Sequence, residues 1–179
     1  TRPNVIIILA DDLGYADLGC QGSKDLVTPH IDSLAANGVR CTSGYVSCPV
    51  CCPSRAGLLT GRYQQRFGFE LNWPHADRNS DRIGVPDDIP LFPQRLHEAG
   101  YTTGVFGKWH LGSHRTRRPT NRGFDEAFWH DNGGVYFPDR KTGRHTGLML
   151  GDDPAPAAPG STTDLFADAA AAFITKNSG

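Results

Sequence analysis

The chain has 179 residues, with 18 basic against 19 acidic side chains and a formal net charge of −1. This balance excludes a strongly basic nucleic-acid binder held by counterion release, and it excludes an acidic tail that only solvates its neighbours. A hydrophobic fraction of 38% suffices for a core, while no apolar run approaches the roughly 20 residues of a membrane span. The 21 glycines and 13 prolines exceed their average share, so we expect long loops, where functional sites gather.

The first element predicted is a strand at residues 4–10, a β-branched run without alternation. Such a run is typical of a strand that is buried on both faces of a helix-covered sheet. The run ends at Asp11 and Asp12, so two carboxylates follow the carboxyl end of a buried strand. Open α/β sheets bind their ligands at this edge.

Helices and strands then alternate along the chain. Thr28 is expected to cap a helix that opens at Pro29 and closes at Gly38, and a second strand is predicted at residues 39–46. Apolar spacing, together with the positions of proline and glycine, predicts two further helices and a strand, at residues 53–59, 91–99 and 101–107.

The last third of the chain carries less regular signal, above all at residues 115–160. Thr163 and Asp164 are expected to cap a final helix at residues 165–174, after a Pro/Ala-rich connector at residues 152–160. The alternation of strands and helices is typical of an α/β fold. Because the pattern ends on a lone helix, we expect the sheet to be incomplete in this chain.

Three of the five cysteines, Cys48, Cys51 and Cys52, lie close together. A zinc knuckle is one interpretation, because Cys48 and Cys51 form a C-x-x-C pair, but the sequence offers no second ligand pair. A local disulfide is another interpretation. The third is a reactive side chain at the N-terminus of the helix opened by Pro53, where free N–H groups and the helix dipole favour anions, with Arg55 one turn further on.

The residues around this cluster resemble a known family signature. Residues 51–62, CCPSRAGLLTGR, resemble the first signature of the type I sulfatases, C-x-P-S-R-x-x-x-L-T-G-R. Residues 100–112, GYTTGVFGKWHLG, resemble the second signature, G-Y-x-T-x-x-x-G-K-W-H-L-G. Residues 2–14 and 122–125 are similar to further segments of the family, in the family's order. The chain is therefore identified as a member of the type I, formylglycine-dependent sulfatases.

The resemblance implies an alkaline-phosphatase-like α/β fold, with a mixed sheet covered by helices on both faces. It implies that residues 1–179 are the N-terminal portion of a single catalytic domain, and that the remaining metal and sulfate ligands lie beyond Gly179. Because the sequence opens without an initiator Met, we expect it to start inside a longer product. Family habit places such enzymes in the periplasm or outside the cell, or in the lysosome of an animal.

The resemblance assigns the central chemistry to Cys51. A formylglycine-generating maturation enzyme would oxidise this residue to formylglycine (3-oxoalanine), whose aldehyde hydrates to a gem-diol. One hydroxyl would attack the sulfur of a sulfate ester, and the second would help to expel sulfate and regenerate the aldehyde, a variant of covalent catalysis. A serine hydroxyl would instead leave a stable sulfated enzyme without an internal route out.

The resemblance also implies a Ca²⁺ site. Asp11 and Asp12, together with the modified Cys51, would hold this hard cation, which prefers oxygen ligands. The bound ion would polarise the sulfate group. Taken without the other motifs, an Asp–Asp pair predicts a solvated turn at the end of a strand.

Three further residues receive roles in the same way. Arg55 would hold the formylglycine, Lys108 would bind both the formylglycine and the sulfate, and His110 would assist deprotonation of the second hydroxyl. On an extended segment, residues two apart point to the same side. Lys108 and His110 are therefore expected to face one pocket, and Trp109 is expected to pack on the other side.

Three segments leave two interpretations open. Asp131 and Asn132 resemble the family's late metal pair but come early in the chain, which favours a role outside the metal site. The basic residues 115–118 predict a solvated loop or, less strongly, a surface that attracts a sulfated polymer. A place on the substrate rim is the less favoured interpretation of Asn72, Trp73 and His75.

We predict that the protein hydrolyses a sulfate ester, on a sulfated carbohydrate or an aryl sulfate. Residues 61–68 resemble the bacterial branch near galactosamine-sulfate and aryl-sulfate enzymes. A phosphonate or phosphate ester hydrolase of the same superfamily is one alternative. Others are a non-catalytic anion-binding relative with an unmodified Cys51, and a zinc-knuckle interaction module.

Overall fold

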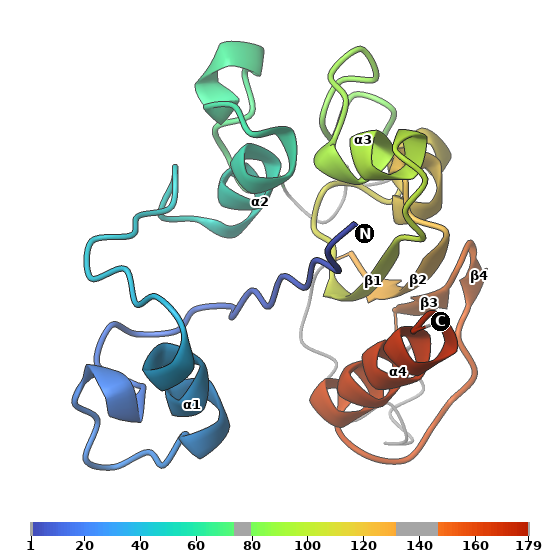
Figure 1. Ribbon diagram of the computed structural model, residues 1–179. Coiled ribbons are helices and arrows are strands. Elements are labelled where there is room, and N and C mark those ends of the chain that lie inside the picture. The colour runs from blue at the N-terminus through green and yellow to red at the C-terminus, as the bar shows by residue number, and fades with distance from the viewer. Residues whose placement is uncertain (1, 74–79, 132–146, 179) are drawn as a thin grey trace. The chain divides into compact units, whose positions relative to one another are not determined.

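The computed structural model describes residues 2–73, 80–131 and 147–178 (Figure 1). The chain divides into two compact units, residues 1–45 and residues 46–179. Within the described ranges, every helix is too short or too polar to cross a membrane.

The unit at residues 1–45 contains one short 3-10 helix and one α-helix, η1 (Gly19–Gln21) and α1 (Pro29–Asn37). Thr28 stands at the N-cap position of α1, but its hydroxyl does not cap the helix. It accepts the backbone N–H of Gly19 at 2.9 Å and donates to the Asp32 carboxylate at 3.0 Å. The predicted helix and its N-cap residue are therefore confirmed, but the Thr28 hydroxyl joins η1 to α1 instead of capping the helix.

The strands predicted at residues 4–10 and 39–46 are not formed in the structure. The side chains of residues 5–9 are between 44% and 81% exposed. A strand needs a neighbour that pairs its backbone N–H and C=O groups, and none of the described strands pairs with either segment. β-Branched composition alone therefore does not make these segments strands.

The unit at residues 46–179 is built around a four-stranded mixed sheet. Its strands, in spatial order, are β1 (Gly104–Lys108), β2 (Glu126–His130), β3 (Leu148–Leu150) and β4 (Asp153–Pro154). β1 and β2 are parallel, with Lys108 opposite His130, while the other two pairs are antiparallel. The strand predicted at residues 101–107 is confirmed as β1, which starts at Gly104, whereas β2, β3 and β4 lie where little regular structure was predicted.

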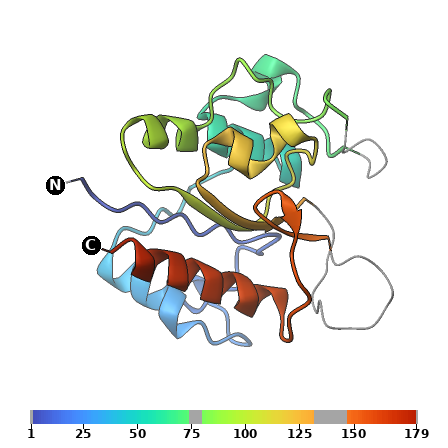
Figure 2. The ribbon, with the colours of Figure 1, turned by 90° about the vertical axis from the view of Figure 1, so that its right-hand side faces the viewer.

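One face of the sheet is covered by α4 (Thr162–Lys176), which lies alongside β1 and β2 (Figure 2). The ring of Phe106 lies 5.5 Å from that of Phe173, and the ring of Phe128 lies 4.9 Å from that of Phe166. Each of the two central strands thus contributes one phenylalanine ring that packs against α4.

The opposite face of the sheet forms the main core. Ala127 and Trp129 of β2 are 4% and 1% exposed, and they belong to one cluster with Cys52 and Ala56. The latter two residues come from α2 (Cys51–Thr60), which lies on the side of the sheet away from α4 (Figure 2). The predicted α/β fold, with helices on both faces of a mixed sheet, is confirmed.

The other helices among the described residues of this unit are short: η2 (Gln64–Phe67), α3 (Phe92–Glu98), η4 (Arg115–Arg117) and η5 (Pro119–Arg122). The predicted helix at residues 91–99 corresponds to α3. α4 begins earlier than predicted, because Ser161 rather than Thr163 or Asp164 is its cap. The Ser161 hydroxyl accepts the N–H of Asp164 at 3.1 Å and donates to its carboxylate at 2.7 Å.

The approach to β1 is fixed by Asp125, which stands just before β2. Its carboxylate accepts the backbone N–H of Thr103 at 2.8 Å and lies 3.0 Å from the Thr103 hydroxyl. Burial acts to raise the pKa of Asp125, but the hydrogen bonds from Thr103, together with the hydrogen bond and charge of His97, outweigh it and hold the pKa below the usual value of 3.8. The carboxylate therefore joins the starts of the two parallel strands.

We expect Asp125→Asn to lower the free energy of unfolding by about 1 kcal/mol at neutral pH, because a hydrogen-bonded charge is lost. The folded-state pKa lies below the unfolded one, so the stabilisation is present above about pH 4 and is lost as the pH falls through the folded pKa. Urea unfolding at several pH values tests this. The exposed Asp168→Asn is the control, and an Asp125→Asn deficit that persists unchanged at pH 2 would contradict the assignment.

Candidate active site

Cys51 is the first residue of α2. The helix begins two residues before the predicted start at Pro53, because a proline in the first turn removes only an N–H that has no partner within the helix. No side chain caps the helix from Val50, but the Asn72 side-chain oxygen accepts the N–H of Cys52 at 2.9 Å. The half-buried Cys51 therefore lies at the positive end of a helix, as the third interpretation of the cysteine cluster requires.

Arg55 connects α2 with the end of β1. It follows Cys51 by one turn of the helix, and its guanidinium Nη1 donates to the backbone carbonyl of Lys108 at 2.6 Å. This bond joins residues that stand 53 positions apart in the sequence. The two signature segments are thus brought together within one compact unit.

Lys108 is the last residue of β1, and the chain leaves the strand conformation at His110, two residues later. Trp109 continues the pairing with β2 by donating its N–H to the carbonyl of His130 at 2.8 Å. His110 then adopts a left-handed conformation, with φ 58°, and is 5% exposed. Lys108 and His110 were predicted to point the same way because the segment was expected to be extended. That expectation is wrong at His110, because the strand ends at Lys108.

Trp109 packs in the core, as predicted. It is 3% exposed, and its ring meets that of Phe124 edge to face at 5.9 Å.

Cys52 differs sharply from its neighbour Cys51. It is 2% exposed, and burial raises the pKa of its thiol to about 11. The carboxylate of Asp131 adds to this rise, whereas the ammonium group of Lys108 opposes it. Cys52 therefore remains a neutral thiol of the core.

Asp131 follows β2 and accepts the N–H of Gly112 at 3.2 Å. This bond ties the end of β2 to the segment that carries His110. Its possible metal partner Asn132 lies outside the described residues. The contact of Asp131 with the turn after β1 could not be predicted from the sequence. The bond joins residues that are distant in the chain, and its donor is a backbone N–H that any residue but proline supplies.

Asn72 is a second site residue whose position could not be deduced from local sequence. It serves the N-terminus of α2 from 20 positions downstream, and capping patterns in sequence describe only adjacent residues. Of the other two residues considered for a substrate rim, Trp73 packs against the main core and His75 lies outside the described residues.

The two carboxylates assigned to a metal, Asp11 and Asp12, belong to the unit at residues 1–45, whereas the residues described above belong to the other unit. Both are exposed, and Asp12 adopts a left-handed conformation with φ 58°. A non-glycine residue with this geometry is uncommon and is enriched at functional sites.

Two of the alternatives for the cysteine cluster lose support. All five cysteines are free, so Cys48, Cys51 and Cys52 form no disulfide. Within the part of the chain that the structure describes, neither Cys48 nor Cys52 belongs to a group of three or more side chains placed to hold a metal. A zinc knuckle requires four such ligands.

Comparison with known proteins decides the family. The family model described as Sulfatase matches residues 3–179. The chain belongs to the sulfatase family. It is 42% identical over 137 residues to arylsulfatase D of Homo sapiens, which covers 69% of this chain and 22% of that protein. It is 44% identical over 135 residues to N-acetylgalactosamine-6-sulfatase of Mus musculus, covering 73% of this chain and 26% of that protein.

Solved structures of similar chains agree with the fold. The crystal structure of Ps i-CgsB superposes with a TM-score of 0.85 at 37% identity, covering 98% of this chain and 42% of that one. A structure solved in complex with its substrate D-glucosamine-2-N,6-O-disulfate gives 0.74 at 28% identity, covering 98% of this chain and 31% of that one. The chain thus spans about a quarter of the length of these curated relatives and less than half of the sulfatase structures.

We expect the two adjacent cysteines to react differently in folded protein that was produced without a maturation enzyme. At pH 8 a pKa of about 11 leaves on the order of one thiolate per thousand Cys52 thiols, and the side chain is also buried. Iodoacetamide should therefore modify Cys51 and spare Cys52, as mapped by peptide mass spectrometry. Denatured protein, in which both cysteines should react, is the control, and equal labelling in the folded state would contradict the assignment.

Proposed function

We propose that the protein containing this chain is a sulfuric ester hydrolase that releases sulfate from an organic sulfate ester. The bond from Arg55 to the backbone of Lys108 carries this proposal, because it brings the two sulfatase signatures into one site. Family membership over residues 3–179 supports the same reaction class.

In this proposal Cys51 is converted to formylglycine by a maturation enzyme, and the hydrated aldehyde supplies the nucleophilic oxygen. Its place at the start of α2 favours an anionic sulfate nearby, because the N–H groups and the dipole of the helix present positive charge there. Arg55 holds the modified residue while its guanidinium remains bonded to the Lys108 carbonyl. Lys108 binds the sulfate, and His110 accepts or returns a proton at a hydroxyl of the modified residue.

Asp11 and Asp12 would hold a Ca²⁺ ion together with an oxygen of the modified Cys51. Their donor chemistry fits, because adjacent carboxylates supply the hard oxygen ligands that Ca²⁺ prefers, and both are exposed. Bound Ca²⁺ would supply charge that stabilises a sulfate group.

We further propose a sulfated carbohydrate as the substrate, with simple aryl sulfates as artificial substrates. Relatives named as N-acetylgalactosamine-6-sulfatase support this, as do similar structures solved with k-i-k-neocarrahexaose and with D-glucosamine-2-N,6-O-disulfate. Residues 1–179 would form the N-terminal portion of one catalytic domain. The protein would act in the periplasm or outside the cell, or in a lysosome if it comes from an animal.

The first test uses the full-length protein purified from its own host. We expect the peptide with Cys51 to have the lower mass that results when CH₂–SH is replaced by CHO. We also expect hydrolysis of 4-nitrophenyl sulfate, and Cys51→Ser should lower kcat by at least a thousandfold, because serine lacks the second hydroxyl of the hydrated aldehyde.

Parallel assays with 4-nitrophenyl phosphate and a phenyl phosphonate separate the reaction classes. Preferential turnover of a phosphorus ester would replace the proposal by a phosphonate or phosphate ester hydrolase. An unmodified thiol at Cys51, together with sulfate binding and no turnover, would instead indicate an anion-binding relative.

Removal of metal provides a second test. We expect a Ca²⁺ chelator to abolish turnover and Ca²⁺ to restore it, while Ca²⁺ at a hundredfold excess over its Kd should stabilise the fold by about 2.7 kcal/mol. Asp12→Asn should weaken Ca²⁺ binding, measured by calorimetry, at least tenfold, because one ligand charge is lost. The exposed Asp25→Asn in the same unit is the control, and undiminished Ca²⁺ binding by Asp12→Asn would refute the metal role.

A further inference from the structure

His110 is held in a conformation that is uncommon for a non-glycine residue. Its φ of 58° lies in the left-handed region, and the side chain is 5% exposed. Such a conformation persists only where the surrounding structure over-determines it. The neighbours of His110 in the chain should therefore be fixed by unusually many contacts.

Trp109 provides the nearest of these contacts. Its indole Nε1 donates to the backbone carbonyl of Arg117 at 2.9 Å, while its ring packs edge to face on Phe124. The indole is thus held both by its face and by its one polar atom. Because Trp109 directly precedes His110, these contacts restrict the chain at the start of the strained turn.

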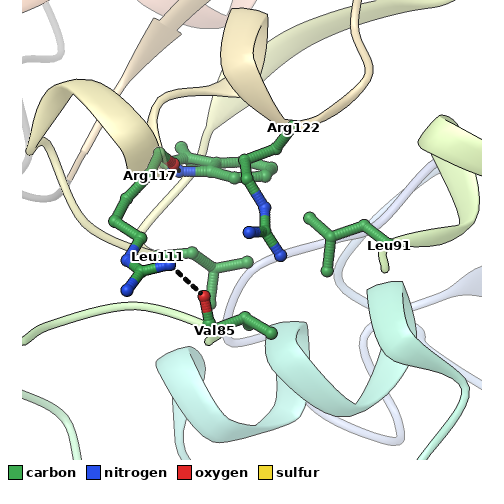
Figure 3. Close-up of a pocket in the computed structure, with 6 residues that line it drawn as sticks. Val85, Leu91, Leu111, Arg117 and Arg122 are labelled. Atoms are coloured by element: carbon green, nitrogen blue, oxygen red, sulfur yellow. Dashed lines mark hydrogen bonds between the residues drawn. The ribbon is translucent and has the colours of Figure 1, made fainter. Parts of the chain in front are cut away.

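Arg117 in turn binds the loop at residues 81–89. Its guanidinium donates to the carbonyl of Val85 at 2.8 Å (Figure 3). It also donates to the carbonyl of Asp81 at 3.0 Å and to the carboxylate of Asp87. The side chain is only 11% exposed. The basic residues 115–118 therefore do not form the uniformly solvated loop that was predicted, since Arg117 points into the protein.

The same loop touches the turn through backbone atoms. A Cβ atom on Gly84 would lie 2.6 Å from the carbonyl oxygen of Leu111, and one on Gly112 would lie 2.7 Å from that of Ile83. Both glycines have positive φ, 122° and 102°. Residues 83–84 and 111–112 can approach this closely only because neither glycine carries a side chain.

Arg122 reinforces the loop from a second side. It is 4% exposed and donates to the carbonyl of Ile89 at 2.8 Å, and it shares the carboxylate of Asp87 with Arg117. Burial is the main cause that lowers the pKa of Arg122. Two guanidinium groups that point into the protein and share one carboxylate are costly to desolvate. Both donate hydrogen bonds to this one loop.

We propose that Arg117 is a positioning residue of the sulfatase site, which acts through the indole of Trp109 to fix the segment 108–112. The loop at residues 81–89 holds the guanidinium of Arg117, and the backbone carbonyl of Arg117 holds the indole of Trp109. Trp109 in turn fixes its two neighbours in the chain, Lys108 at the end of β1 and the strained His110. This inference rests on the proposed function, because it is the catalytic use of Lys108 and His110 that makes their placement matter.

The test uses full-length enzyme with Trp109→Phe, which removes the indole N–H and also replaces the bicyclic ring by a smaller phenyl ring. We expect kcat for 4-nitrophenyl sulfate to fall at least fivefold, because a buried hydrogen bond and part of the core packing are lost, with KM changed less than twofold. Amide hydrogen exchange of residues 108–112 should become faster. Arg117→Gln should do the same more strongly, and Arg117→Lys should restore only part of the activity, because lysine lacks the planar fork.

Arg118→Gln is the matched control. Arg118 donates to the carbonyls of Ser113 and Asp152 at 3.0 and 2.9 Å, whereas the indole of Trp109 bonds to the carbonyl of Arg117. We expect it to lower the Tm while kcat and the exchange of residues 108–112 stay at wild-type values.

Wild-type kcat and wild-type exchange in Trp109→Phe would overturn the inference, as would an equal loss of kcat in Arg118→Gln. A wild-type enzyme that hydrolyses no sulfate ester would refute the proposed function instead. Amide exchange in the same variants would still decide whether Arg117 and Trp109 fix the segment.

Discussion

The hydrogen bond from Arg55 to the carbonyl of Lys108 is the contact on which the arrangement of the site depends. It is charge-assisted on the donor side, and it joins the first turns of a helix to the last residue of a strand. The donor depends on the long side chain of Arg55, which must reach across from α2, whereas the acceptor is a backbone carbonyl that any residue at position 108 would supply. The two signatures are thereby linked through main-chain geometry as well as through side-chain chemistry.

Around this bond, the site is supported mainly by loops. Asn72 serves the start of α2, Asp131 holds the turn after β1, and the loop at residues 81–89 packs against the same turn. Each of these segments has little regular secondary structure and is held by hydrogen bonds or close contacts that involve backbone atoms. The abundance of glycine fits this design, since close approach of two backbones at residues 83–84 and 111–112 leaves no room for a Cβ atom.

Local signals in the sequence were sufficient for the helices and for β1, because helix ends depend on nearby proline, glycine and apolar spacing. They were insufficient for pairing: residues 4–10 have strand composition but no paired neighbour among the described strands, while β2 went unnoticed because both of its faces carry apolar residues. The site residues on α2 and β1 could be named from their signatures, but the left-handed turn at His110 could not, since it is imposed by contacts from distant loops.

The register of α2 has a consequence for selectivity between two identical side chains. Cys51 and Cys52 are adjacent, so the helix separates their directions by about 100°, and one thiol enters the core while the other stays half-buried at the helix end. In the folded chain this difference is purely steric and electrostatic. In an unfolded chain the two thiols are equally accessible. An enzyme that modifies Cys51 before folding must therefore select it by its sequence distance from Pro53 and Arg55, whereas an enzyme that acts after folding could select it by accessibility alone.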